Sequence, residues 1–263
     1  MTGKVLIFVP AYNCQDQIVR VLDQVETAWV QRAVAQVIVV NNRSTDDTAD
    51  RVAERIRIRG DDYVKLLLND ANYGLGGSHK VAFQYARLHG FDWIVVMHGD
   101  DQGSIADFRE LIEEPQLAGI DGFMGSRFMT GSRSPGYSTF RIFGNHVFNA
   151  IYSACLCYPI RDLGSGLNIY RVSSLRFSDI VRFPDDLTFN CVMLCSQVIG
   201  GDKLQFLPIS WREDDQVSNV KLVSQSFQTL RIALSALTKK SRFIAAEHRS
   251  KTIDSYTWKV VDV

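Results

Sequence analysis

The alternation of buried-strand and helix patterns in the first hundred residues constrains the fold of this chain more than any other feature. Short, mostly apolar runs that are typical of buried strands occur at residues 5–9, 37–40, 64–68 and 93–97. Segments with apolar residues at helical spacing separate them, at residues 15–30, 46–58 and 78–88. This order predicts an α/β fold in which a doubly wound, mostly parallel sheet carries helices on both faces.

The pattern is less regular after the fourth strand. We expect further helices at residues 105–112, 141–157 and 187–198, and further strands at residues 122–128, 167–171 and 204–211. No internal repeat, low-complexity tract or linker divides the chain. We therefore expect one domain over residues 1–219, followed by a C-terminal helical extension over residues 220–263.

Charge, hydropathy and cysteine content exclude several classes of protein. Lys plus Arg and Asp plus Glu each number 29, so no basic excess points to nucleic acid as a partner. No apolar run is long enough to cross a membrane, and the first one is too short for a secretory signal, so we expect a cytoplasmic protein. The odd number and the spacing of the cysteines favour reduced, buried thiols over disulfides or zinc. They are Cys14, Cys155, Cys157, Cys191 and Cys195.

Four polar segments follow predicted strands, which is where an open parallel sheet binds its ligands. In chain order they are Pro10-Ala11-Tyr12-Asn13, Asn41-Asn42-Arg43-Ser44, Asn72-Tyr73-Gly74-Leu75-Gly76 and His98-Gly99-Asp100-Asp101-Gln102. Each also has an ordinary structural interpretation: a strand end, a helix N-cap, a glycine turn and a turn-forming aspartate pair. The glycine segment lacks the spacing of a dinucleotide fingerprint, but its glycines allow a backbone to approach a ligand closely.

The two aspartates of the fourth segment favour a metal site. A carboxylate at the end of a buried apolar strand is costly unless it meets a cation. Mg²⁺ or Mn²⁺ bridging a diphosphate is the natural partner for Asp100 and Asp101.

Taken together and in this order, these segments resemble the family 2 glycosyltransferases of the GT-A fold. The resemblance covers about residues 4–240 and is nearest to the dolichyl-phosphate and polyprenyl-phosphate mannosyltransferase group. Besides the four segments, it is carried by Ser44-Thr45-Asp46-Asp47-Thr48, Gly125-Ser126-Arg127-Phe128, Arg141 with Asn145, and Asp162-Leu163-Gly164-Ser165-Gly166-Leu167.

The resemblance implies an inverting transfer of a sugar from a nucleotide-diphosphate sugar to an acceptor, with a polyprenyl phosphate or lipid-linked acceptor favoured. Transfer to a saccharide or small-molecule hydroxyl in cell-surface polysaccharide synthesis is the alternative. A nucleotidyltransferase and a catalytically silent nucleotide-binding module are weaker alternatives. The donor contacts it implies are Pro10, Ala11, Tyr12, Asn13, Asn41, Asn42, Ser44, Asn72, Gly74, Gly76, His98, Gly99, Asp100 and Asp101.

Three departures from the family pattern limit this inference. Asn41-Asn42 stands where the family usually has two aspartates, which leaves the base of the nucleotide open. His98 stands where the metal motif usually begins with aspartate, so Asp100 is the expected metal ligand and His98 is a ligand or a ribose contact. Trp211-Arg212-Glu213-Asp214 replaces the usual Tyr-Arg-x-Arg, which indicates a diverged acceptor site.

The acceptor determines which further residues take part in the reaction. A hydroxyl acceptor needs a general base, and Asp185 or Asp186 stands where the resemblance implies one. A lipid phosphate needs no base but needs positive charge. The candidates for that contact are Arg127, Arg133, Arg141 and Arg212.

The segment after the last predicted strand carries an apolar stripe if it is helical. The stripe consists of Val220, Val223, Phe227, Leu230, Leu234 and Leu237, and Lys239, Lys240 and Arg242 follow it. Two interpretations remain open. The helix packs on its own domain or on a second subunit, or it lies on an anionic membrane leaflet as a peripheral contact.

Overall fold

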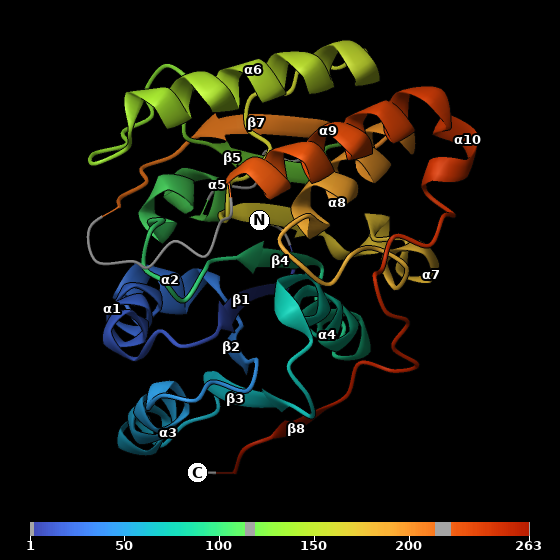
Figure 1. Ribbon diagram of the computed structural model, residues 1–263. Coiled ribbons are helices and arrows are strands. Elements are labelled where there is room, and N and C mark those ends of the chain that lie inside the picture. Colours follow the sequence, from blue (N-terminus) through green and yellow to red (C-terminus); the bar gives the residue numbers. More distant parts are fainter. Residues whose placement is uncertain (1–2, 114–118, 214–221, 263) are drawn as a thin grey trace.

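The computed structural model describes residues 3–113, 119–213 and 222–262. Within these residues one eight-stranded sheet lies between two layers of helices (Figure 1). Its strands are β1 Val5–Ala11, β2 Gln36–Asn41, β3 Val64–Asn69, β4 Trp93–Val96, β5 Gly122–Ser126, β6 Asn168–Arg171, β7 Leu204–Pro208 and β8 Trp258–Val260. They lie in the order β7-β5-β6-β4-β1-β2-β3-β8.

The pairing of these strands confirms the predicted doubly wound, mostly parallel sheet. β1 pairs in parallel with β2 and β4, and β2 pairs in parallel with β3. β6 lies antiparallel between β4 and β5, while β5 and β7 are parallel. Because β1, β2 and β4 run in the same direction, their carboxyl ends share one edge of the sheet.

The helices differ from the predicted ones mainly at their ends. They are α1 Gln15–Val25, α2 Ala28–Ala33, α3 Thr48–Arg59, α4 Gly74–Leu88, α5 Arg109–Glu113, α6 Thr139–Leu156, α7 Phe177–Ile180, α8 Phe189–Ile199, α9 Leu222–Thr238 and α10 Lys240–Phe243, with 3₁₀ turns at Ile105–Phe108 and Val172–Ser174. The predicted helix 15–30 is two helices separated by Glu26 and Thr27. α4 begins at Gly74, four residues before the predicted start at residue 78.

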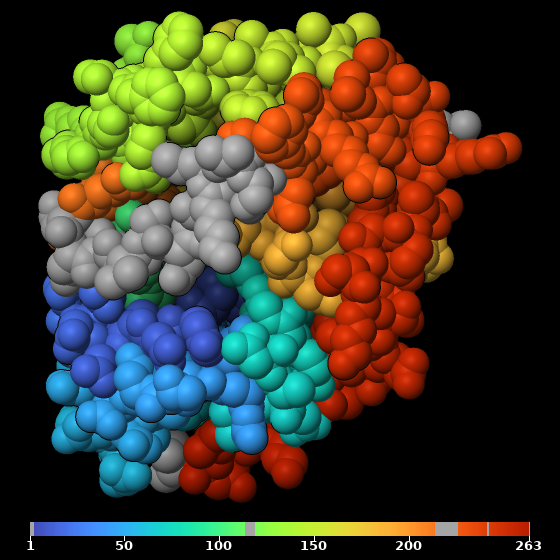
Figure 2. Space-filling view, viewed as in Figure 1, coloured from blue at the N-terminus to red at the C-terminus, as the bar shows by residue number. Residues whose placement is uncertain are grey.

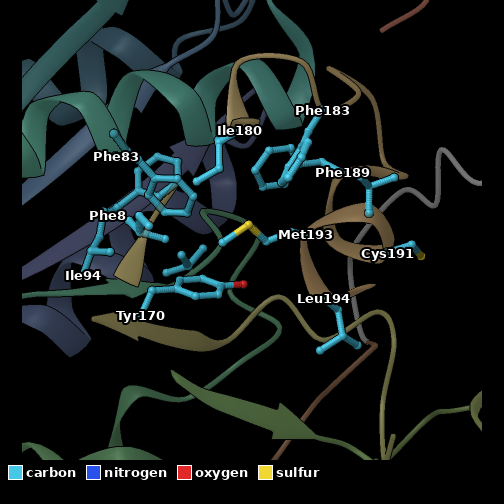
Figure 3. Packing of buried hydrophobic residues seen from close by; sticks show 14 of the residues in the cluster. Phe8, Phe83, Ile94, Tyr170, Ile180, Phe183, Phe189, Cys191, Met193 and Leu194 are labelled. Atoms are coloured by element: carbon cyan, nitrogen blue, oxygen red, sulfur yellow. The ribbon is translucent and has the colours of Figure 1, made fainter. Parts of the chain in front are cut away.

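A hydrophobic core lies on each face of the sheet. On one face, Leu6 and Phe8 of β1 pack with α4, α6, α8 and α9. On the other face, Val5 and Ile7 pack with α1, α3 and the region around Ile105. Figure 3 shows the first core where Phe8 meets Phe83, Phe183 and Phe189 of the surrounding helices and loop. Each such buried side chain contributes about 1.5 to 3 kcal/mol to folding.

The C-terminal segment contains a strand that the sequence pattern did not predict. β8 pairs antiparallel with β3, in register Leu68 to Lys259, and covers that edge of the sheet. Figure 1 shows the chain running from α10 down one side of the molecule to β8. Neither the strand's three-residue length nor its mixed composition gives a clear pattern.

Two further expectations meet the structure here. No helix within the described residues has the length and the hydropathy to span a bilayer. The described cysteines are free thiols, and four of them are buried, as expected; Cys157 is exposed, so the prediction of a buried thiol there is wrong.

Candidate active site

The polar segments gather at the carboxyl edge of the sheet. Ala11 of β1 lies in register with Asn41 of β2, and Phe8 lies in register with Val96 of β4. Pro10 and Ala11 belong to β1 itself, and the Pro10 carbonyl accepts a hydrogen bond from the Gly99 amide at 3.0 Å. In the space-filling view, a hollow lies between blue N-terminal residues, teal residues of α4 and gold residues of α8 (Figure 2).

The loops after β1 and β2 are joined to each other by side chains. Asn13 Oδ1 accepts a hydrogen bond from the Thr45 amide at 2.8 Å, and the Asn13 amide donates to Ser44 Oγ at 3.1 Å. Asn41 Oδ1 accepts from the Ser44 amide at 2.8 Å. The neighbouring Tyr12 side chain is exposed. These contacts give the predicted donor-contact segment a defined backbone shape.

Asn42 connects three elements. Its buried Oδ1 accepts hydrogen bonds from Asn69 Nδ2 at 2.9 Å and from the Tyr73 amide at 2.8 Å. Its Nδ2 donates to Asn72 Oδ1 at 2.8 Å. An aspartate could not donate this last bond, so the departure from the family pattern at this position has a structural use.

Gly74 and Gly76 allow a close approach of protein backbone. The Gly76 amide donates to the Asp185 carbonyl at 2.8 Å. A Cβ atom at Gly74 would clash with the Asp185 carbonyl, and one at Gly76 would clash with the Pro184 carbonyl. Gly74 also has a φ of +73°, which favours glycine. In this structure the glycines admit the 183–186 loop, where the sequence suggested a ligand.

The loop after β4 separates its two aspartates. The Asp101 side chain is fully buried, and its carboxylate accepts hydrogen bonds from Arg20 Nε at 2.6 Å and Gln24 Nε2 at 2.7 Å, both from α1. Arg212 also forms an ion pair with it. Asp101 therefore connects this loop to α1 through its buried carboxylate.

Asp100 is accessible by contrast. Its side chain is 36% exposed, its Oδ1 accepts from the Gln102 amide at 3.2 Å, and its Oδ2 lies 4.0 Å from His98 Nδ1. The His98 ring packs against Gly166, where a Cβ atom would clash with it. Burial lowers the pKa of His98 and the Asp100 charge opposes this shift, so the imidazole is neutral and can act as a ligand.

Asp100 and His98 fit a divalent cation. Two ligand atoms that each lie about 2.1 Å from one cation can be at most about 4.2 Å apart, and the observed separation is 4.0 Å. His98 Nε2 is buried and has no hydrogen-bond partner among the described residues. No hydrogen bond from these residues to that nitrogen therefore holds the ring in one orientation. The described residues include no cluster of three or more metal-ligating side chains. The remaining ligands would therefore be phosphate oxygens and water.

Arg127 forms a buried ion pair. Its Nε and Nη2 each donate to the Asp162 carboxylate at 2.8 Å, and its Nη1 donates to the Tyr137 hydroxyl at 3.1 Å. Both the Arg127 and the Asp162 side chains are less than 10% exposed. The pair joins two segments that carry the family resemblance. The Arg127 guanidinium, which was predicted to bind an acceptor phosphate, here forms a structural contact with Asp162 and Tyr137.

Asp185 is bound by a buried lysine. Lys80 Nζ donates to Asp185 Oδ1 at 2.6 Å, to the Phe183 carbonyl at 2.6 Å and to the Tyr256 hydroxyl at 2.9 Å. The Tyr256 hydroxyl also lies 2.8 and 3.0 Å from the two Asp185 oxygens. Burial lowers the pKa of Lys80 to about 8, and the Asp185 charge opposes that shift.

Asp186 precedes α8 and has a different environment. Its Oδ1 accepts a hydrogen bond from the Thr188 amide at 2.8 Å and another from the Thr188 hydroxyl. The residue is exposed. These local bonds are typical of a turn that leads into a helix.

The other three arginines predicted to contact an acceptor phosphate differ in their partners. Arg141 Nη1 forms a 2.6 Å ion pair with Glu213 Oε2, and Arg212 is paired with Asp101. Arg133 is exposed on a loop whose backbone bonds to Ile209 and Trp211. Of these arginines, it is the one whose guanidinium forms no ion pair within the described part of the chain. Asp214, the acidic departure from the family pattern, lies outside the described residues.

Sequence reasoning missed two residues of this region, Lys80 and Tyr256. Lys80 lies between buried residues of α4, and a lysine on the apolar side of a predicted helix is a signal that could have drawn attention to it. Tyr256 lies 71 positions from Asp185, and nothing local marks it.

Comparison with known proteins agrees with the fold and the motifs. The model of the family described as Glycosyl transferase family 2 matches residues 6–177. This match covers more than half of the chain, and the protein belongs to that family and is a glycosyltransferase.

Solved structures share the GT-A fold. Glucosyl-3-phosphoglycerate synthase from Mycobacterium tuberculosis in complex with UDP is similar with a TM-score of 0.60 and 15% identity, over 91% of this chain and 80% of that one. The same enzyme with Mn²⁺, UDP-glucose and glycerol 3-phosphate has a TM-score of 0.59 and 14% identity, with the same coverage. A mannosyltransferase from Pyrobaculum calidifontis with GDP-mannose and Mn²⁺ has a TM-score of 0.58 and 16% identity, over 92% of this chain and 64% of that one.

Proposed function

We propose that this glycosyltransferase moves a sugar, with inversion, from a nucleoside-diphosphate sugar to a lipid phosphate of the polyprenyl-phosphate class. The observation that carries the proposal is the accessible Asp100 carboxylate beside the His98 imidazole at the carboxyl end of β4. These residues would hold Mg²⁺ or Mn²⁺, which supplies charge neutralisation at the diphosphate leaving group. The similar structures that contain Mn²⁺ with UDP-glucose or GDP-mannose support this donor and metal chemistry.

The environments of Asp185 and Asp186 favour a phosphate acceptor. A hydroxyl acceptor must lose its proton to a base, whereas a phosphate is already ionised. Asp185 is neutralised by Lys80, and Asp186 accepts two bonds from Thr188. In the proposed step, a phosphate oxygen forms a bond to the anomeric carbon as the bond from that carbon to the nucleoside diphosphate breaks. Arg133 is the candidate for contact with the acceptor phosphate.

Transfer to a saccharide or small-molecule hydroxyl is the second candidate. It is favoured by the exposure of Asp186, whose Oδ2 is not one of the atoms bonded to Thr188. A similar structure with phosphoglyceric acid, at 14% identity, also supports a small acceptor. In that case Asp186 would accept the hydroxyl proton.

The test is a transfer assay with each acceptor class. The protein is incubated with Mn²⁺ and a panel of UDP- and GDP-sugars, and with either a short polyprenyl phosphate in detergent or a set of mono- and disaccharides. We expect a sugar-phosphate lipid whose anomeric configuration, read by NMR, is opposite to that of the donor. Transfer to the saccharides alone, or a product that retains the donor configuration, would contradict the proposal.

A further inference from the structure

The outer surfaces of α6 and α9 form an exposed apolar face. It consists of Phe140, Phe143 and Val147 of α6 and Phe227, Leu230, Leu234 and Leu237 of α9, and we call it the α6/α9 face. Thirteen large apolar side chains are exposed among the described residues, and these seven are the majority. Figure 1 shows α6 at the top of the view beyond β7, and α9 below it, crossing in front of β5 and β7. Such a concentration marks an interaction surface.

The inward side of α9 explains why these side chains point outward. α9 buries Thr229, Ala233 and Ala236, and the Thr229 carbonyl accepts a hydrogen bond from the Tyr152 hydroxyl of α6 at 2.7 Å. These small residues and the partly buried Ile232 pack against the protein, and four other large apolar residues recur at 227, 230, 234 and 237 on the opposite side. This is the reverse of a helix that covers its own core. Val220 lies outside the described residues, and the Val223 side chain is not described.

The charged residues within α6, α9 and α10 have one sign. The chain as a whole carries 29 basic and 29 acidic residues, yet no Asp or Glu occurs in residues 139–156 or 222–246. Arg231, Lys239, Lys240 and Arg242 are exposed on α9 and α10 or between them. An anionic surface is complementary to this arrangement. A second copy placed symmetrically on the same face would bring like charges together.

We propose that the α6/α9 face lies on an anionic lipid leaflet, with its apolar side chains at the headgroup boundary and the basic residues of α9 and α10 near lipid phosphates. Apolar area and basic charge together are what such binding requires. The surface is connected to the candidate site, since Arg141, between Phe140 and Phe143 in α6, turns inward to Glu213 and Tyr137. The benefit to catalysis rests on the proposed lipid-phosphate acceptor, whereas the binding itself does not.

The test is vesicle flotation of the full chain, without donor, metal or acceptor. Vesicles of phosphatidylcholine, with or without phosphatidylglycerol, are used at low and high salt. We expect flotation with the anionic vesicles at low salt and a loss at high salt. The variants Phe143→Ser/Phe227→Ser and Lys239→Glu/Lys240→Glu should each weaken partitioning about tenfold or more. Ile58→Ser/Leu88→Ser, which changes two exposed apolar residues elsewhere, is the matched control and should float like wild type.

Two outcomes overturn the proposal. Wild type that stays with the soluble fraction at low salt, or Phe143→Ser/Phe227→Ser that floats as well as wild type, excludes the leaflet. Light scattering that shows a wild-type dimer broken by Phe143→Ser/Phe227→Ser assigns the face to a second copy. Because no substrate is present, these outcomes leave the proposed transfer reaction to be judged by its own assay.

Discussion

The acidic loop after β4 and the acidic loop before α8 lie on either side of His79, yet their carboxylates have different environments. The His79 ring centroid is 6.4 Å from that of His98 in the first loop and 4.8 Å from that of Phe189 at the start of α8. Asp100 is accessible and lies near a neutral imidazole, whereas Asp185 is bound by Lys80 and Tyr256. The comparison shows that the groups bound to a carboxylate determine whether it is available to a ligand.

The largest expected effect follows from removing the accessible carboxylate. Asp100→Asn should lower transfer by about 10³-fold, because neutralisation of the leaving group is worth several kcal/mol. The variant should keep wild-type stability, since the side chain is partly exposed. Turnover is measured with saturating donor and Mn²⁺, beside a urea unfolding curve. Activity that survives both this change and EDTA would show that transfer does not depend on a metal at Asp100.

Arg127→Ala should be damaging for a different reason. It leaves Asp162 buried without its partner, and breaking a buried ion pair costs about 3 to 5 kcal/mol. Urea unfolding measures the loss of stability. Arg133→Ala, at an exposed arginine, is the control and should leave stability unchanged while raising the KM for the acceptor. An Arg127→Ala protein of wild-type stability would mean that this guanidinium is free for substrate.

Replacing Asp185 or Asp186, whose carboxylates are bound by neighbouring residues, should have a small effect on turnover. Asp185→Asn and Asp186→Asn should each stay within about tenfold of wild type with saturating donor, since neither acts as a base in the proposed reaction. Asp185→Asn should also lower stability by about 1 to 3 kcal/mol, because it weakens the partner of buried Lys80. A loss of about 10² or more in either variant would indicate a general base and a hydroxyl acceptor.

His79, which lies between the two loops, should make the free energy of unfolding depend on pH. Burial lowers the pKa of His79 to about 3, and its ordinary value is 6.5. Below the ordinary value the unfolded chain binds a proton that the native state does not, so stability falls as the pH falls. Between about pH 6 and pH 4, wild type should lose up to about 1.4 kcal/mol per pH unit more than His79→Gln. Urea unfolding of both proteins checks this; parallel curves would mean that His79 is protonated in the folded state.

The sequence predicted the sheet well because its signal is local. Each of the first four strands is a run of apolar residues, and the helices between them repeat their apolar positions at helical spacing. The predicted polar segments also lie where they were expected, at the carboxyl ends of the strands. β8 was missed because its stability comes from pairing with β3, which its own residues do not encode.

The side-chain roles could not be predicted, since they depend on partners far away in sequence. Asp101 is matched by Arg20, 81 positions earlier, and Asp185 by Lys80, 105 positions earlier. A motif places a carboxylate at the edge of the sheet, but the packing of other elements decides whether it remains accessible.

The most direct test of the difference between the two loops is Mn²⁺ binding, followed by the loss of the electron paramagnetic resonance signal of free Mn²⁺ in the presence of UDP or GDP. Wild type and Asp185→Asn are predicted to bind Mn²⁺ with similar affinity once the nucleotide is present, and Asp100→Asn is predicted to bind it at least about tenfold more weakly. Equal binding by Asp100→Asn and wild type, or a loss confined to Asp185→Asn, would contradict the assignment of the metal to the loop after β4.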